Sequence, residues 1–390
     1  MRRVSRGPTQ YIVCVNSRPT VSDKPIAAAD RHRKRVVRTT LTGRARRGLA
    51  TVLALIMPLA TAGCAGLFYT FTECTDVAPD SSPSPLAATA PGSSWVYQLQ
   101  SAVPADLATS GFDIVVMDYS ADGSDESAYS ATDVNTIRAG DPGTVLAYFS
   151  IGEAEDYRYY FDSNWVRRLS GIPRDDAPCW LALPNPDWGG NYKVQYWSAG
   201  WQGVIMDYLD RIIDAGFDGV YLDIIDAYEY WADNENGEDF VLTEREAADR
   251  MINFVLAIAN HARSVDSDFL VFPQNGEGIL AFDDGNGAFA ADTYLDAISG
   301  IGIEDLYYDG LERRDATDTN ERLPYLETIR DAGKAVVVVD YVDDGSETSA
   351  NTARIAQFRG LADGAGFVPY AALENRELDV INLATDQPTP

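Results

Sequence analysis

Gly216-Phe217-Asp218-Gly219-Val220-Tyr221-Leu222-Asp223 decides the fold, because it joins a helix stop, an apolar strand and an acidic strand end. Before it, apolar residues recur at helical spacing over residues 201–215, and the glycine ends that helix. The run 219–224 is nearly continuously apolar, which is typical of a parallel strand covered by helices on both sides. Helix, strand and polar strand end in this order are the unit of an α/β protein.

The same unit recurs along the chain and predicts a (β/α)8 TIM barrel. An open, doubly wound sheet is the alternative, but no Gly-x-Gly-x-x-Gly follows the first strand, which disfavours its nucleotide-binding form. Helical patterns are found at 131–139, 201–215, 243–263, 320–332 and 347–363. The eight expected strands are 95–100, 113–119, 145–151, 219–224, 269–274, 297–303, 335–341 and 366–371.

An export leader precedes the barrel. Three arginines at positions 44–47 are followed by the apolar run 49–63, which is too short to span a bilayer as an ordinary helix. Cys64 directly follows Ala62-Gly63, as in the cleavage box of a bacterial lipoprotein, although Thr61 stands where Leu or Val is usual. We therefore expect a protein that is either extracellular or attached to the cell envelope through a lipid anchor at Cys64, with no other contact to a membrane.

Three regions follow from this organisation. Residues 1–63 are a basic leader and signal peptide, and residues 64–92 are a linker rich in Pro, Ser and Ala. Residues 93–386 form the TIM barrel, which we expect to be a monomer. Cys74 and Cys179 could pair in an oxidising compartment, and two free thiols are the alternative.

Charge is distributed unevenly along the chain. Residues 1–48 carry 13 Lys and Arg against two acids, so the total of 31 basic and 59 acidic residues leaves 18 and 57 for the remainder, a net charge of −39. Such a surface repels phosphate groups, so we expect no nucleic-acid partner. Adaptation to a salt-rich habitat is one explanation of the acid excess, and a calcium-binding or merely solvated surface is the alternative.

Acids and amides end six successive expected strands. Side chains at the C-terminal ends of barrel strands form the active site, and capping of the following helices is the competing explanation for any one of them. The residues concerned are Asp118 and Tyr119, Glu153, Asp223 with Asp226, Gln274 and Asn275, Glu304 and Asp305, and Asp340 and Tyr341.

The scarcity of histidine narrows the range of possible chemistry. After the leader the only histidine is His261, inside an expected helix, so Ser-His-Asp or Cys-His catalysis lacks a base and a His-based zinc site lacks ligands. The loops 233–238 and 283–287 resemble calcium loops but lack the first acidic ligand. We expect no metal and no cofactor. Paired carboxyl groups remain, the chemistry that glycoside hydrolysis uses.

Aromatic residues crowd the long segment after the third strand, and more of them follow the fourth and sixth strands. Flat rings pack against the C–H faces of sugars, whereas ordinary packing of loops against the barrel is the alternative. The rings are Trp180, Trp188, Tyr192, Tyr196, Trp197 and Trp201, then Tyr228, Tyr230 and Trp231, and then Tyr307 and Tyr308.

Several motifs resemble glycoside hydrolase family 114, whose characterised activity is endo-α-1,4-polygalactosaminidase. The motifs are Tyr148-Phe149-Ser150-Ile151-Gly152-Glu153-Ala154-Glu155-Asp156-Tyr157-Arg158, Asn185-Pro186-Asp187-Trp188, the stretch 216–223, Gln274-Asn275-Gly276, and Gly302-Ile303-Glu304-Asp305-Leu306. The resemblance implies catalytic carboxylates at the ends of strands four and six, which match Asp223 and Glu304. The loop after Trp188 departs from the family by lacking an expected acid, which leaves subsite specificity open.

The resemblance implies a glycosidase acting within a polysaccharide, on an α-1,4-linked galactosamine-type polymer, and the leader adds that this enzyme is exported. Asp223 would be nucleophile or base and Glu304 general acid/base, with the two roles exchangeable. The expected substrate-binding residues are Asp118, Tyr119, Glu153, Trp188, Asp226, Gln274, Asn275, Asp340 and Tyr341. The same barrel acting on another polymer is a second hypothesis, and a non-catalytic carbohydrate-binding envelope lipoprotein is a third.

Overall fold

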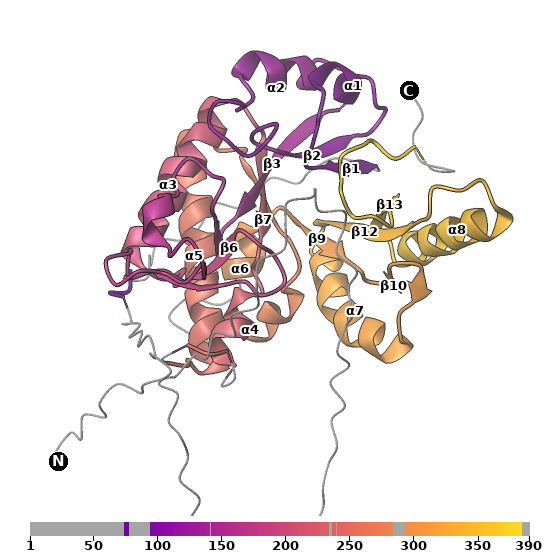
Figure 1. The fold of residues 1–390 in the computed structure, drawn as a ribbon. Coiled ribbons are helices and arrows are strands. Elements are labelled where there is room, and N and C mark those ends of the chain that lie inside the picture. Colours follow the sequence, from indigo (N-terminus) through magenta and orange to yellow (C-terminus); the bar gives the residue numbers. More distant parts are fainter. Residues whose placement is uncertain are drawn as a thin grey trace, which may run out of the picture. The chain divides into compact units, whose positions relative to one another are not determined.

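The computed structural model describes residues 74–77, 94–140, 142–233, 236–238, 240–283 and 293–383. Eight parallel strands follow one another around a barrel, and their order is their order along the chain (Figure 1). The leader and the lipidation site expected at Cys64 lie outside the described residues. The eight strands are β1 (Trp95–Gln98), β2 (Ile114–Asp118), β3 (Thr144–Ser150), β7 (Gly219–Asp223), β8 (Leu270–Pro273), β9 (Gly300–Glu304), β12 (Ala335–Asp343) and β13 (Val368–Leu373).

Two sheets make up the wall of the barrel. One has the order β1-β2-β3-β7-β8 and the other the order β13-β12-β9. A parallel bridge between Gln274 and Gly302 joins β8 to β9, and the backbone N–H of Ser299 donates to the carbonyl of Val271 (2.7 Å). At the other seam, between β1 and β13, the indole N–H of Trp95 donates to the Val368 carbonyl (3.0 Å). The predicted TIM barrel is thus confirmed, with one seam closed by a side chain.

Helices cover the outside of the barrel, and all five expected helices are present. Figure 1 shows α7 and α8 beside the three-stranded sheet, and α3 and α5 beside the five-stranded one. Capping boxes begin two helices, since Ser130 and Asp133 cap α2 and Thr243 and Glu246 cap α5. The helices are α1 (Pro104–Ala108), α2 (Ala131–Arg138), α3 (Ala199–Asp214), α4 (Ala227–Ala232), α5 (Glu244–Val265), α6 (Thr293–Ala297), α7 (Ala316–Asp331) and α8 (Ser349–Gly364).

The strand expected at 297–303 begins later than predicted, because Ala297 ends α6 and β9 starts at Gly300. Additional short strands lie in the connections. β4 (Glu153–Glu155), β6 (Asn191–Val194) and β5 (Leu181–Pro184) form an antiparallel sheet within the long segment after β3. β10 (Tyr308–Asp309) and β11 (Glu312–Arg313) form a hairpin after β9. No helix of the described residues is long and apolar enough to cross a membrane.

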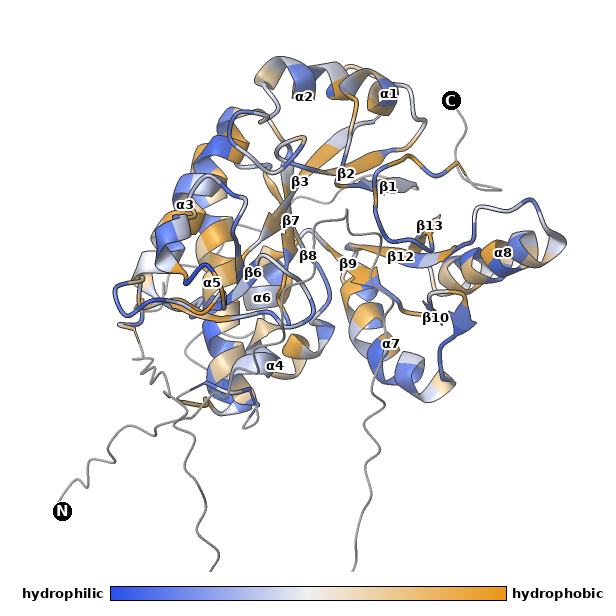
Figure 2. Ribbon diagram, viewed as in Figure 1, coloured by the Kyte–Doolittle hydropathy of each residue, from blue (hydrophilic) through white to orange (hydrophobic). Residues whose placement is uncertain are grey.

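Large aromatic side chains fill the barrel, and Figure 2 shows hydrophobic residues concentrated in the strands. Trp95, Tyr97, Tyr221 and Tyr370 are each at most 2% exposed, and their ring centroids lie 5.3–6.2 Å apart in contacting pairs. Gly302 faces Tyr221, and a Cβ there would lie 1.8 Å from the Tyr221 hydroxyl. The glycine therefore makes room for the aromatic layer directly below the barrel mouth.

A disulfide joins Cys74 to Cys179, as one of the two alternatives predicted. The backbone N–H of Cys74 also donates to Gln195 Oε1 (2.8 Å), and that of Val77 donates to the Trp197 carbonyl (3.1 Å). Residues 74–77, expected to belong to the linker, are thereby fixed to the segment that leads into α3.

Candidate active site

The C-terminal ends of the strands surround a cavity of about 580 Å³ whose wall includes both Asp223 and Glu304. Asp223 is the last residue of β7 and pairs in register with Ser150 of β3. Glu304 is the last residue of β9 and pairs with Val339 of β12. The barrel therefore brings the two carboxyl groups expected to be catalytic into one cavity at the end where barrel enzymes place their chemistry.

Asp223 is held by two donors. The hydroxyl of Tyr148 donates to Asp223 Oδ2 (2.6 Å), and the backbone N–H of Ile224 donates to Oδ1 (2.8 Å). Burial raises the pKa of Asp223 most, and the nearby Glu304 carboxylate raises it further. The two donors lower it, but the pKa still reaches about 8. A carboxyl group with such a pKa can exchange a proton near neutral pH.

Glu304 is held by a phenol at its carboxyl group and by an amide at its backbone. Tyr341 donates its hydroxyl to Glu304 Oε1, and the backbone N–H of Glu304 donates to Asn275 Oδ1 (3.0 Å). Burial raises the pKa of Glu304, while the phenol of Tyr341 and the guanidinium of Arg376 oppose that rise. Since the charge of Glu304 also raises the pKa of Asp223, the two carboxyl groups titrate as a coupled pair.

Three adjacent strands are each followed, within two residues, by a residue in the left-handed backbone conformation. Ile224, Asn275 and Asp305 follow β7, β8 and β9 with φ of 62°, 55° and 50°. This conformation is unfavourable for side chains, and most of all for β-branched ones such as that of Ile224. Strained backbone of this kind is typical of functional sites, where the surrounding structure holds it in place. Here it turns the chain sharply after Asp223 and Glu304.

Tyr148→Phe should shift the pH dependence of any activity that needs Asp223. The lost phenol stabilised the ionised carboxylate, so the pKa of Asp223 should rise above about 8, and the limb of the pH profile that reports Asp223 should move to higher pH. The measurement is kcat/KM against pH, with thermal melting as the check of folding. An unchanged profile in a folded Tyr148→Phe variant would show that this hydrogen bond does not tune Asp223.

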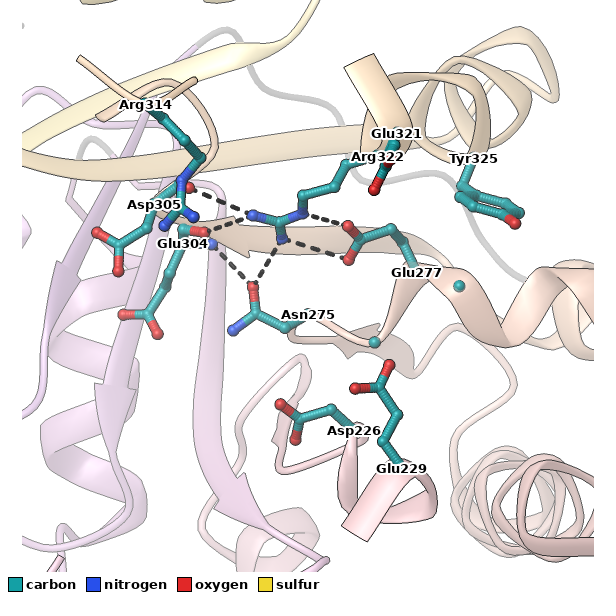
Figure 3. A pocket seen from close by; sticks show the side chains of 12 residues that line it. Asp226, Glu229, Asn275, Glu277, Glu304, Asp305, Arg314, Glu321, Arg322 and Tyr325 are labelled. Carbon is teal, nitrogen blue, oxygen red and sulfur yellow. Dashed lines mark hydrogen bonds and ion pairs between the residues drawn. The ribbon is translucent and has the colours of Figure 1, made fainter. Parts of the chain in front are cut away.

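A second cavity of about 440 Å³ adjoins Glu304 from the other side and is drawn in Figure 3. The Arg322 side chain from α7 lies between Glu277, with which it forms an ion pair, and the end of β9, where it donates to the Glu304 carbonyl (3.1 Å). Asp226 and Glu229 lie on the side of the cavity opposite Arg322. Glu304 thus forms part of the wall of both cavities.

Most of the expected substrate-binding residues face these cavities. Glu153 is fully buried. It accepts hydrogen bonds from the side-chain amides of Asn185 (2.8 Å) and Asn191 (3.0 Å), and it forms an ion pair with Lys193. Trp188 is 55% exposed and forms part of the wall of the cavity that contains Asp223. Asp118, Glu153, Trp188, Gln274 and Tyr341 line the cavity with Asp223, and Asp226 and Asn275 line the one in Figure 3.

Asp118 is engaged within the protein, although it reaches the cavity wall. Both of its carboxylate oxygens accept from Arg158, at 2.8 and 2.7 Å, and Arg158 also pairs with Glu155 (2.7 Å). The Arg158 side chain is only 1% exposed. The three residues form a buried ionic cluster, and its members Asp118 and Glu155 are part of the cavity wall.

Two expected substrate-binding residues lie elsewhere. Tyr119 follows Asp118 on a strand, so it points to the opposite face, where it packs against Tyr208 of α3 (5.2 Å between ring centroids) and donates to Asp125. Asp340 is fully buried and accepts from the backbone N–H groups of residues 306, 307 and 308 at 2.8–2.9 Å. Tyr119 therefore packs in the helical layer and Asp340 fixes the loop after β9, and neither residue lines the two cavities.

The aromatic residues after β3 mostly pack within the protein. Trp188 lines the cavity, whereas the other five are at most 5% exposed and contact one another or neighbouring rings, as in the pair Trp180–Trp201. Residues that line the cavity and were not predicted include Tyr97 and Arg376. Tyr97 directly follows Val96 on the first strand, and successive side chains on a strand face opposite sides. This alternation could have indicated that Tyr97 lines the cavity. Arg376 follows the last strand in a segment without periodicity.

Within the described part of the chain, no group of three or more His, Cys, Asp or Glu side chains is arranged to hold a metal ion. The ionisable groups that the structure does bring together at the barrel mouth are the carboxyl pair, the phenols that donate to it and the arginine beside it. A barrel with two buried carboxyl groups at its strand ends is typical of enzymes that hydrolyse glycosidic bonds.

The chain belongs to glycoside-hydrolase family GH114, whose sequence profile matches residues 77–389. It is 42% identical over 290 residues to the uncharacterized protein MJ1477 of Methanocaldococcus jannaschii, a match covering 74% of this chain and 78% of that one. It is also 42% identical over 294 residues to an uncharacterized protein of Thermotoga maritima, covering 75% and 84% of the two chains.

Two solved structures share the fold. Ega3 of Aspergillus fumigatus in complex with galactosamine superposes with a TM-score of 0.51 at 18% identity, over 74% of this chain and 95% of that one. The glycoside hydrolase domain of PelA from Pseudomonas aeruginosa gives a TM-score of 0.51 at 15% identity, over 74% and 97%. At sequence identities this low, the similarity shows a shared barrel fold and nothing more. Family membership makes the protein a glycoside hydrolase by descent.

Proposed function

We propose that the protein is an exported glycosidase that cleaves within an α-1,4-linked galactosamine-type polymer, with Asp223 and Glu304 as its catalytic carboxyl groups. The single observation that carries the proposal is the placement of these two groups at the ends of β7 and β9 in one cavity, with the pKa of each raised by burial. One group that holds a proton and one that is ionised are what glycoside hydrolysis requires. Which of the two donates the proton is left to experiment.

An amino-sugar substrate is supported by charge. The chain beyond the leader carries a net charge of −39 (18 basic against 57 acidic residues), and the cavity wall beside Glu304 includes Asp226, Glu229 and Glu277. A polymer of free amino sugars is cationic and is attracted to such a surface at low salt. The fold relative Ega3 was crystallised with galactosamine, which is a cation of this kind.

Export is part of the same proposal. Besides the apolar run after the arginines, the disulfide between Cys74 and Cys179 supports an oxidising compartment. A lipid at Cys64 would then be the attachment to a membrane, and the barrel itself would act as a monomer on polysaccharide outside the cell or in its envelope.

The test is hydrolysis by the purified, oxidised protein of four glycans: an α-1,4-galactosamine polymer, its fully N-acetylated form, chitosan and a neutral α-1,4-glucan. We expect oligosaccharides of mixed length from the first glycan, as an endo-acting enzyme produces, and less product at high salt because screening weakens the attraction. The N-acetylated polymer is the matched control, since it has the same linkage and no charge. Exclusive release of single sugars would contradict endo-cleavage.

A carbohydrate-binding protein without catalysis is the second candidate, since much of the cavity wall would also suit a bound sugar. The double variant Asp223→Asn/Glu304→Gln separates the two. An enzyme loses product formation in this variant and keeps its affinity within about threefold, because uncharged isosteres preserve the shape of the cavity. No product from any glycan with the wild-type protein, together with unchanged binding by the double variant, would favour the binding protein.

A further inference from the structure

The segment after the last barrel strand, residues 374–379, is called here the C-terminal strap. It lies against the loop after β1, at the seam that no strand pairing closes in the described residues. The Leu378 carbonyl accepts from the backbone N–H groups of Leu99 (2.9 Å) and Gln100 (3.1 Å). The side-chain amides of Gln98 and Gln100 donate to the carbonyls of residues 379 and 377. These bonds hold the strap across the seam at the barrel mouth.

The strap brings Arg376 into the catalytic cavity. Arg376 has a left-handed backbone (φ 60°), and its guanidinium lies 3.7 Å from the centroid of the Tyr341 ring. The same guanidinium makes two hydrogen bonds to Asp305, at 3.0 and 2.7 Å. Tyr341 is the residue that donates to Glu304, and Asp305 directly follows Glu304 in the chain. Arg376 therefore contacts both neighbours that determine where the Glu304 carboxyl lies.

We propose that Arg376 is a positioning residue for Glu304: through its stacking on Tyr341 and its paired bonds to Asp305, it fixes the Glu304 carboxyl for catalysis. A stacked, bidentate guanidinium is a rigid arrangement that a lysine cannot reproduce. The proposal rests on the proposed function only for its kinetic readout. The strap is then part of the active site, although it lies beyond the last element of the barrel.

The charges around Glu304 give the proposal a second, electrostatic consequence. Arg376 opposes the rise in the pKa of Glu304 that burial causes, whereas the Asp305 carboxylate adds to that rise. Removal of either group should therefore shift the titration of Glu304, in opposite directions. The polar groups that interact with Glu304 come from five strands and the strap: Tyr97 from β1, Tyr221 and Asp223 from β7, Gln274 after β8, Asp305 after β9, Tyr341 from β12 and Arg376 from the strap.

The experiment compares Arg376→Met, Arg376→Lys and Asp305→Asn with the wild-type protein. The titration of Glu304 is followed by NMR on protein labelled with 13C at the glutamate carboxyl groups, and Glu304→Gln identifies the signal. In Arg376→Met we expect Glu304 to titrate about one pH unit higher or more, because an attractive charge is lost, and in Asp305→Asn we expect it to titrate lower. This readout needs no substrate, so it remains valid if the proposed function fails.

Hydrolysis supplies the second readout. Arg376→Met should lower kcat by roughly 10- to 100-fold with KM changed by less than about threefold, since a misplaced catalytic group affects the transition state more than binding. Arg376→Lys should restore the titration of Glu304 through its charge and leave kcat reduced, because the stacking is lost. Arg354→Met is the matched control: Arg354 pairs with Asp344 (2.8 Å) and lines neither cavity, so activity and the titration of Glu304 should be unchanged.

Two outcomes would overturn the proposal. In a folded Arg376→Met variant, an unchanged titration of Glu304 would show that the guanidinium does not act on it. A raised KM with unaltered kcat would show instead that Arg376 binds substrate directly. If Arg376→Met does not fold, Asp305→Asn decides the question, because the amide has one acceptor oxygen in place of two and so breaks the bidentate pair while leaving the arginine: full kcat in that variant would contradict positioning through Asp305.

Discussion

Asp223→Asn is expected to lower kcat/KM by about 10²- to 10⁴-fold, the range typical of a lost acid/base group, while the fold is retained. The replacement keeps the size of the side chain and an oxygen that can accept from Tyr148, which donates at 2.6 Å in the wild type. Glu304→Gln should have an effect of the same order, and the double variant should be little worse than either single one, because the two groups act as one unit. Initial rates on the galactosamine polymer measure this effect.

Asp223→Asn should also be more stable to unfolding than the wild type at pH 7 to 8. Burial raises the pKa of Asp223 to about 8, from an ordinary value of 3.8. A folded-state pKa above the unfolded one means that the folded protein retains a proton that the unfolded chain releases, so stability is lost as pH rises from about 4 to about 8. Asparagine cannot ionise and avoids this loss. We expect Tm to rise by about 2 °C or more at pH 8 and by little at pH 4.

Asp214→Asn is the control for both measurements, because Asp214 is an exposed aspartate at the end of α3 and should change neither activity nor Tm. Lower stability of Asp223→Asn at pH 8 would contradict the assignment of a buried carboxyl with a raised pKa at this position. Retained activity would remove Asp223 from the mechanism and leave Glu304 to act with another acid.

Arg158→Met should destabilise the protein by about 3–5 kcal/mol, the cost of leaving buried charges without their partner. The Arg158 side chain is 1% exposed and makes hydrogen bonds of 2.7–2.8 Å to Asp118 and Glu155. Methionine fills much of the volume and supplies no charge, so two carboxylates remain buried together. Urea-induced unfolding at neutral pH measures the loss of stability.

Arg167→Met is the matched control, since Arg167 pairs with Asp175 at the surface and such pairs contribute about 1 kcal/mol or less. The triple replacement Asp118→Asn/Glu155→Gln/Arg158→Met should recover part of the lost stability, because it removes the unpaired charges together with the arginine. If the triple variant were no more stable than Arg158→Met alone, lost packing of the arginine rather than unpaired charge would explain the effect.

The fold could be predicted from the sequence because each barrel strand is buried on both faces and bounded by turn residues. The stretch 216–223 shows this clearly, with Gly216 in a left-handed conformation (φ 83°) between α3 and β7. Seam closure could not be predicted. It depends on a side chain, Trp95, and on the strap, and neither follows a period that sequence analysis can detect.

The site was predicted in part. Proximity to a strand end made Asp223 and Glu304 two of several candidates, and the resemblance to family 114 singled them out. Strand-end position gave neighbouring residues the same weight, although successive side chains on a strand face opposite sides. This alternation separates Asp118 from Tyr119, and Tyr341 from Asp340. The first of each pair lines the cavity, whereas Tyr119 packs against α3 and Asp340 accepts from the backbone of the loop after β9. The role inferred for Arg376 requires contacts between segments distant in sequence, which a single sequence does not reveal.

The disulfide between Cys74 and Cys179 determines how the protein responds to a mechanical load. The bond spans 105 residues, so β1, β2 and β3 all lie inside the covalent loop that it closes. Tension applied to the chain before Cys74 passes through the sulfur atoms to the segment leading into α3 and bypasses those strands. If the chain is anchored before Cys74, as proposed, a pull on the anchor therefore leaves the first three strands, including Tyr148 beside Asp223, unstretched.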